Sequence, residues 1–196
     1  IHTGTFNGWR RKILRAEIDS VRAQKDIDLV CFTGDIENMQ PGEVEAMMPE
    51  LKRLPYMYSV LGNHDYAEYT DATPAEKKRM TQKVVELENK LSNGQWSRDS
   101  IWLAGSEDYS KIPEQDHSNL KKTLSGIPTS AFVILLQHDP SAWEKDILLH
   151  SNVQLTLTGH THGGQMQVLG LRPTMVALKE DLGLYDKNGR CLYVNA

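Results

Sequence analysis

Two histidines with one residue between them carry the most suggestive chemistry in the sequence. His160 and His162 belong to the heptapeptide Gly-His-Thr-His-Gly-Gly-Gln at residues 159–165. The apolar and β-branched run at residues 155–158 precedes it, so the heptapeptide begins where a strand is expected to end. On a turn bounded by glycines, the two imidazoles can diverge towards two neighbouring points. Such a pair is a good ligand set for divalent transition metals. The alternative is a polar turn that contains two histidines by coincidence.

Three other segments show the same pattern, in which a buried strand ends at a side chain that can bind metal. Each is a continuous apolar run followed by a carboxylate, an amide or an imidazole, with Gly or Pro close by. In open α/β sheets, binding sites form at the carboxyl ends of strands. We therefore interpret the four strand ends as parts of one metal site. The three runs are 29–33, followed by Gly34-Asp35; 57–61, followed by Gly62-Asn63-His64-Asp65; and 131–136, followed by Gln137-His138-Asp139-Pro140.

The order and spacing of these motifs resemble those of the calcineurin-like metallophosphoesterases. That superfamily includes Ser/Thr phosphatases, purple acid phosphatases, phosphodiesterases and repair nucleases. The resemblance implies an α/β fold, a four-layer αββα sandwich of two mixed β-sheets, with a dinuclear metal site at one edge. It extends over nearly the whole chain and rests on Gly34-Asp35, Gly62-Asn63-His64-Asp65, His138 and Gly159-His160-Thr161-His162.

The resemblance also implies a role for each metal ligand. Ile1-His2-Thr3-Gly4 is similar to the end of the family's first motif, Asp-x-His, so an Asp is expected immediately before Ile1. Asp35 would bridge two metals, because each of its carboxylate oxygens can bind one cation. Mixed nitrogen and oxygen ligands suit Mn, Fe or Zn better than Ca or Mg, so two divalent or mixed-valence transition metal ions are expected. The first metal would be held by His2, Asp35, His162 and the absent Asp, and the second by Asp35, Asn63, His138 and His160.

The same resemblance implies hydrolysis without a covalent enzyme intermediate. A hydroxide that bridges the two metal ions would attack phosphorus in line, while the metals neutralise the equatorial oxygens. His64 would protonate the leaving oxygen. Asp65 would hydrogen-bond the His64 ring and favour its charged form. Asn38 is expected to support the site rather than to bind a metal.

Length and composition are those of one domain of ordinary size. A chain of 196 residues is long enough to bury a two-layer core. The net charge of −4 and the pI near 6.0 do not support a general nucleic-acid-binding surface, so metal ions would have to attract a phosphate substrate locally. Cys31 and Cys191 lie in apolar strand patterns and are interpreted as small buried side chains rather than as a disulfide. No apolar run is long enough to cross a membrane, and no signal peptide is visible.

Hydrophobic periodicity and turn residues predict the other elements. Residues 73–76, Thr-Pro-Ala-Glu, form a capping box that opens a helix, and His150 is interpreted as the C-terminal cap of another. Residues 91–100 fit the family pattern poorly, so an interruption is expected there. The resemblance also implies that the single domain, 1–196, is truncated at both ends. Helices are expected at 9–24, 41–54, 73–91, 116–124 and 141–149, strands at 28–33, 57–61, 101–104, 131–136, 155–158 and 165–168, and a hairpin at 183–194.

The substrate stays open at this stage, because a phosphate monoester, a diester and a pyrophosphate all fit the predicted site. Gly163-Gly164-Gln165 resembles a branch that is often tethered to membranes and includes UDP-2,3-diacylglucosamine pyrophosphatases. That likeness implies a small-molecule or lipid-linked phosphoester, and membrane association through a segment absent from this chain. A metal-dependent nuclease is a second hypothesis, disfavoured by the acidic balance and the lack of an aromatic-plus-basic stripe. A metal-binding relative without activity is a third. Such relatives typically lose several ligands, whereas only the Asp before Ile1 is absent here.

Overall fold

Two units, residues 1–94 and 95–196, make up the fold, and each has its own hydrophobic core. The computed structural model describes residues 2–55, 57–91, 97–98, 100–110, 116–162 and 179–195. The boundary between the units falls inside the segment 91–100, which the sequence marked as irregular. Among the described residues, no helix has the length and apolar character needed to cross a membrane.

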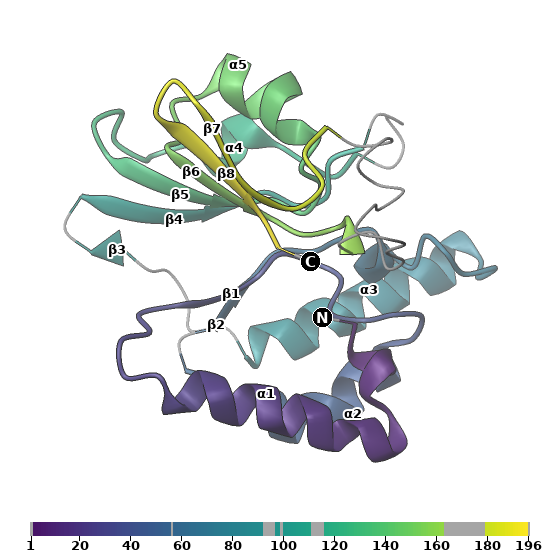
Figure 1. Ribbon diagram of the computed structural model, residues 1–196. Helices are drawn as coiled ribbons and strands as arrows, with labels where there is room; N and C mark the ends of the chain where they lie inside the picture. The colour runs from purple at the N-terminus through teal and green to yellow at the C-terminus, as the bar shows by residue number, and fades with distance from the viewer. Residues whose placement is uncertain are drawn as a thin grey trace, which may run out of the picture. The chain divides into compact units, whose positions relative to one another are not determined.

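The first unit pairs two short parallel strands and packs helices against them (Figure 1). Val30 lies opposite Met57 in this two-stranded sheet. The helices pack around a core to which α1, α2 and α3 all contribute. The elements are η1 (Thr3–Phe6), η2 (Gly8–Arg10), α1 (Arg11–Ala23), β1 (Val30–Phe32), α2 (Pro41–Leu51), β2 (Met57–Ser59), η3 (His64–Tyr66) and α3 (Pro74–Asn89).

The helices of this unit follow the local rules that the sequence displays. Helix α2 begins with Pro41 at its first position, where the missing amide hydrogen costs nothing. Its buried side chains recur at helical spacing and are Val44, Met47, Met48 and Leu51. At the start of α3, Thr73 and Glu76 form the predicted capping box. The predicted starts of α2 and α3 are therefore confirmed.

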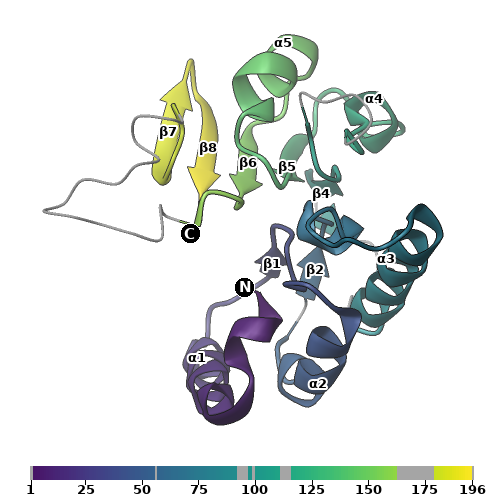
Figure 2. The same ribbon diagram turned by 90° about the vertical axis from the view of Figure 1, so that its right-hand side faces the viewer.

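The second unit is built on a six-stranded mixed sheet in the order β3-β4-β5-β6-β8-β7. Strands β4, β5, β6 and β8 are parallel, and β3 and β7 are antiparallel edge strands. Figure 2 shows α4 and α5 on the same face of this sheet. The elements are β3 (Ser97–Arg98), β4 (Ile101–Gly105), α4 (Leu120–Thr123), β5 (Phe132–Leu136), the π-helical turn η5 (Trp143–Ile147), α5 (Leu148–His150), β6 (Leu155–Thr158), β7 (Gly183–Lys187) and β8 (Arg190–Val194).

The predicted fold class, α/β with two β-sheets, is confirmed. The predicted hairpin is confirmed as β7 and β8. Its turn residues Asn188 and Gly189 have φ values of 56° and 77°, as a two-residue turn between twisted strands requires. The helix predicted at 116–124 is shortened to α4, and the one predicted at 141–149 becomes η5 and α5. The strand predicted at 165–168 lies outside the described residues.

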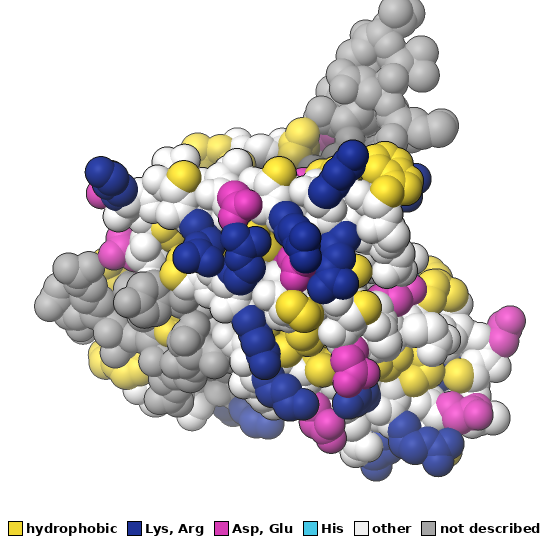
Figure 3. Space-filling model, turned by 90° about the horizontal axis from the view of Figure 1, so that it is seen from below, with side chains coloured by type: hydrophobic (Ala, Val, Ile, Leu, Met, Phe, Trp, Pro, Cys, Tyr) yellow, Lys and Arg dark blue, Asp and Glu magenta, His cyan; other side chains and the backbone are white. Residues whose placement is uncertain are grey.

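Lys and Arg side chains gather on the face that carries α1 (Figure 3). Arg11 and Arg15 both donate to the buried carboxylate of Glu50, at 2.9 Å and 2.5 Å, so part of this charge is neutralised. Trp9 is 68% exposed, and the side chains of Arg10 and Lys12 lie over its ring. This small aromatic and basic cluster was not expected from the sequence, which showed no such stripe.

Candidate metal centre

His2 and Asp35 are held in the first unit with their donor atoms facing each other. The His2 Nδ1 atom lies 3.0 Å from the carbonyl oxygen of Glu37. Because a carbonyl oxygen only accepts, Nδ1 carries the hydrogen and the lone pair is on Nε2. That Nε2 atom lies 3.7 Å from Asp35 Oδ2. Two donors at this separation can share one cation at metal–ligand distances of about 2.1 Å, with the second ring nitrogen anchored as in other metal-binding histidines.

Asp35 follows β1 in a backbone conformation that few side chains adopt. Its φ is 58°, and that of the preceding Gly34 is 93°. Such left-handed residues persist only where their surroundings hold them. Asp35 Oδ1 accepts a hydrogen bond from the backbone N–H of His64 at 3.0 Å, which leaves Oδ2 on the side of His2. The loop after β2 thus orients the carboxylate that follows β1.

Asp65 joins the same two loops through backbone hydrogen bonds. Its Oδ2 atom accepts from the N–H groups of Asp35 at 2.8 Å and Gly62 at 2.9 Å, and its Oδ1 accepts from Glu37 N–H at 3.1 Å. The side chain is completely buried. These contacts assign Asp65 to positioning the loops that carry the metal donors.

His64 is oriented differently from the expectation that Asp65 would hydrogen-bond its ring. Its Nδ1 atom donates to the carbonyl oxygen of Asn38 at 2.6 Å. Its ring packs edge-on against His2, with centroids 4.6 Å apart, and against Tyr69 at 4.5 Å. The backbone of Asn38 therefore supplies the ring partner that was assigned to Asp65. Nε2 is the ring nitrogen left to exchange a proton with a ligand.

Asn63 lies directly before this histidine, at the start of η3, and is buried with 4% exposure. Its position after β2 is the one that the sequence predicted for an amide ligand. Asn63 is thus carried by the same loop whose backbone orients Asp35.

In the second unit, His138 and His160 follow the neighbouring parallel strands β5 and β6. The backbone N–H of Gly159 donates to the His138 carbonyl at 3.1 Å and ties the two loops together. The His160 Nδ1 and His138 Nε2 atoms are 3.0 Å apart, and the rings are nearly perpendicular at 86°. Two nitrogens bound to one cation at about 2.1 Å and about 90° would be about 3.0 Å apart, so this spacing fits a shared metal ion.

The turn that carries His160 and His162 is held by the residue between them. Both histidines have positive φ values, 66° and 53°. The Thr161 hydroxyl donates to the Asp181 carbonyl at 2.7 Å, and the Tyr185 hydroxyl accepts from Asp181 N–H at 3.1 Å. Thr161 is thus fastened to the segment before β7. The remainder of the predicted motif, residues 163–165, lies outside the described residues, as does Ile1.

The donor chemistry fits divalent transition metals. Each unit supplies one pair of donors at a spacing that suits a cation: imidazole with carboxylate in the first, and two imidazoles in the second. Imidazole nitrogen mixed with carboxylate oxygen favours Mn, Fe or Zn. Asp35 and Asn63 follow β1 and β2, and His138 and His160 follow β5 and β6.

Glu37 is a buried carboxyl group that the sequence interpretation missed. Both of its carboxyl oxygens are buried and have no hydrogen-bond partner among the described residues. Burial raises its pKa to about 8, helped by the negative charges of Asp65, Glu43 and Asp35. A polar residue two positions after Asp35 was the only available signal, and it does not distinguish a buried side chain from an exposed one.

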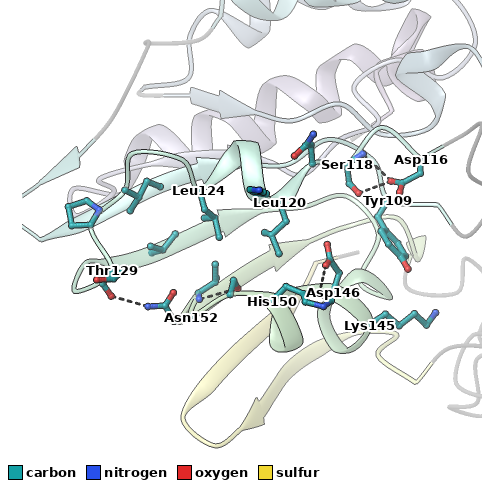
Figure 4. A pocket seen from close by; sticks show the side chains of 17 residues that line it. Tyr109, Asp116, Ser118, Leu120, Leu124, Thr129, Lys145, Asp146, His150 and Asn152 are labelled. Carbon is teal, nitrogen blue, oxygen red and sulfur yellow. Dashed lines mark hydrogen bonds and ion pairs between the residues drawn. The ribbon is translucent and has the colours of Figure 1, made fainter.

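One pocket in the second unit, of about 820 Å³, lies away from these donors (Figure 4). Thr129 and Asn152, which line it, precede β5 and β6, whereas His138 and His160 follow those strands. His150 also lines it and pairs with Asp146 at 2.8 Å, so its partner is a side chain one turn earlier rather than a helix-capping carbonyl. This pocket brings together none of the predicted metal ligands.

Comparison with known proteins gives one consistent family. Residues 1–164 match the family model described as calcineurin-like phosphoesterase. The chain is 30% identical over 85% of its length to a zebrafish (Danio rerio) protein named transmembrane protein with metallophosphoesterase domain, 39% of which is covered. It is 32% identical over 86% of its length to the uncharacterized metallophosphoesterase YkuE of Bacillus subtilis, 59% of which is covered. An uncharacterized metallophosphoesterase of Helicobacter pylori is 29% identical over 88% of the chain, with 46% of that protein covered. The chain therefore spans about two fifths to three fifths of the length of these relatives. No solved structure matches it significantly.

Replacement of Thr161 by Val should loosen the histidine turn. Val keeps the shape of the side chain but removes the hydroxyl that donates to Asp181, leaving a buried carbonyl without this donor. Loss of such a contact should cost about 1–2 kcal/mol of unfolding free energy, and loss of a group that orients metal ligands should weaken metal binding by about 10–100-fold. Urea unfolding and metal titration measure the two effects. Thr161→Ser keeps the hydroxyl and should retain most of both; equal metal affinity in all three proteins would contradict the positioning role.

Glu37 should make the metal-free protein less stable as the pH rises. Because its folded-state pKa of about 8 lies above the ordinary 4.5, folding favours the protonated carboxyl. This contribution is fully present below pH 4.5 and is lost as the pH rises through about 8. Glu37→Gln cannot lose that proton, so its unfolding free energy should decline less between pH 5 and pH 9. Urea unfolding of chelator-treated proteins measures the difference, and parallel pH curves for both proteins would refute the prediction.

Proposed function

The chain belongs to the calcineurin-like phosphoesterase family, and from this premise we propose that it hydrolyses a phosphate mono- or diester, or a pyrophosphate, at a dinuclear metal centre. The observation that carries the proposal is the presence, in each unit, of two donor atoms at a spacing that suits one cation. These are His2 with Asp35, and His138 with His160. The family match spans the residues that supply both pairs.

We assign the predicted ligands to two metal ions. His2, Asp35 and His162 would hold the first ion, and Asp35, Asn63, His138 and His160 the second. Asp35 is assigned to both, because a carboxylate has one oxygen for each cation. When bound, ions such as Mn, Fe or Zn supply Lewis acidity towards the phosphoryl oxygens and an activated water as nucleophile. An acidic chain can then hold a phosphate ester, since positive charge is supplied at the site itself.

His64 is assigned as the general acid. Its Nδ1 atom donates to the Asn38 carbonyl, so only Nε2 can deliver a proton to a leaving oxygen. Asp65 acts through the backbone, because its carboxylate holds the N–H groups of the loops that carry Asp35 and His64. Asp35, in turn, is held by the N–H of His64. The proton donor and the proposed bridging ligand thus lie on two loops that these hydrogen bonds join.

A lipid-linked phosphoester at a membrane surface is the substrate class that we propose within this reaction. Its support is a relative whose name joins a transmembrane protein to a metallophosphoesterase domain. A nuclease is the second candidate, favoured only by the Trp9 cluster with Arg10 and Lys12. Hydrolysis of an aryl phosphate, an aryl phosphodiester, a lipid-linked pyrophosphate and single-stranded DNA separates these candidates. Stoichiometric metal binding without any hydrolysis would indicate a non-catalytic relative.

Replacement of Asp35 by Ala should remove both metal ions and abolish turnover. One side chain is assigned to both ions, so its loss cannot be confined to one of them. His138→Ala should mainly empty the second site and leave the first ion bound. Metal content per chain, measured on the purified variants, separates the two outcomes. His150→Ala is the matched control, because this exposed histidine pairs with Asp146, and it should keep both metals. Two metals retained in Asp35→Ala would place the bridge elsewhere.

Replacement of His64 by Gln should leave the metals bound and slow turnover by about 10²–10⁴-fold, the usual effect of positioned proton transfer. The loss should depend on the leaving group, because an alkoxide needs protonation whereas a nitrophenolate departs readily as an anion. Steady-state rates on alkyl and nitrophenyl esters of the same phosphate measure this ratio. Equal losses on both esters would assign His64 to phosphate binding instead, and loss of metal would make it a ligand.

A further inference from the structure

Glu43 contacts the backbone that orients His64. It lies in the first turn of α2, and its Oε2 atom accepts hydrogen bonds from the N–H groups of Asn38 at 2.9 Å and Met39 at 3.0 Å. The Asn38 carbonyl, which accepts from His64 Nδ1, and the Met39 N–H belong to one planar peptide group. The carboxylate therefore holds one end of a peptide group whose other end holds the histidine ring.

This arrangement also polarises the peptide group that lies between Glu43 and His64. A carboxylate that accepts from a peptide N–H makes the carbonyl of that peptide a stronger acceptor, because hydrogen bonds in a chain polarise one another. Glu43 thus acts on His64 as a carboxylate partner would, but through one peptide group. It occupies the role that the sequence assigned to Asp65, whose carboxylate is occupied by other backbone N–H groups.

Ordinary helix capping does not explain the reach of Glu43. In α3, the acid at the equivalent third position, Glu76, accepts from the N–H of the capping residue Thr73 itself. In α2 the capping residue is Gln40, and Glu43 reaches past it to the two preceding residues. Gly4 gives it room, since a Cβ on Gly4 would lie 2.7 Å from the Glu43 carboxylate.

We propose that Glu43 is a positioning residue for the proton donor, which fixes the Asn38–Met39 peptide group so that His64 presents Nε2 to the leaving oxygen. The proposal rests on the proposed function in that His64 is taken as the general acid. It adds that the ring orientation depends on a carboxylate outside the metal ligands, and on a glycine that leaves space for it.

The first test measures the hydrogen bond of the His64 ring and does not depend on activity. In zinc-loaded protein labelled with ¹⁵N-histidine, the His64 Nδ1–H signal, identified by its absence from His64→Gln, should be protected from exchange with water. Glu43→Ala should lose this protection. Glu43→Gln keeps an acceptor oxygen and should largely retain it. Glu76→Ala, which removes a comparable acid from α3, should leave it unchanged. A protected signal in Glu43→Ala would overturn the proposal.

The second test measures turnover of two phosphoesters that differ in how much their leaving groups need a proton. Glu43→Ala should lower turnover of an alkyl phosphoester by about 10-fold, a part of the effect of full loss of a general acid. It should change turnover of the nitrophenyl ester by no more than about 2-fold, with both metals bound. Gly4→Ala, which displaces the same carboxylate, should show the same ratio, and Glu76→Ala should show none. If His64→Gln lacks leaving-group dependence, the proposed general acid fails. If His64→Gln shows it and Glu43→Ala does not, only the present inference fails.

Discussion

The candidate centre in the first unit depends on one buried carboxylate, that of Asp65. Three backbone N–H groups, from the loops after β1 and β2, converge on its two oxygens. A buried carboxylate is tolerated only when such donors replace its hydration, and a loop can adopt left-handed residues such as Asp35 only when something holds it there. The two demands satisfy each other. The loops solvate Asp65, and Asp65 keeps Asp35 in the conformation that turns its carboxylate towards His2.

In the second unit, different groups orient the candidate metal ligands. There, the strands β5 and β6 are adjacent and parallel, so their ends place His138 and His160 side by side. The left-handed turn is held instead by the Thr161 hydroxyl and by the backbone bond from Gly159 to His138. Imidazole is neutral when it binds metal, which explains why this half of the donor set needs less electrostatic compensation than the half that contains Asp35.

Much of this arrangement could be predicted from the sequence, because apolar runs that end in Asp, Asn or His define both the strand and the place where its donor lies. The ends of β1, β2, β5 and β6 were found in this way. The hydrogen-bond partners could not be found. Asp65 follows His64 in the chain, which suggested a local pair, but the direction of each side chain depends on backbone angles that residue types do not specify. The contact of Glu43 with Asn38 likewise depends on where α2 begins and on the space above Gly4.

The carboxylates of the first unit differ in how well hydrogen bonds compensate their negative charge. This difference bears on metal binding. Asp65 and Glu43 are solvated by backbone N–H groups, and Asp35 by His64 N–H with His2 nearby. Glu37 has no hydrogen-bond partner among the described residues, and burial, together with the negative charges around it, raises its pKa to about 8. A cluster that favours a proton on one member also favours any other positive charge that can enter it. Divalent cations at Asp35 would relieve the same repulsion, so a part of the free energy of metal binding is stabilisation of the fold itself. The acids that make the metal-free unit costly to fold would therefore also favour the binding of a cation.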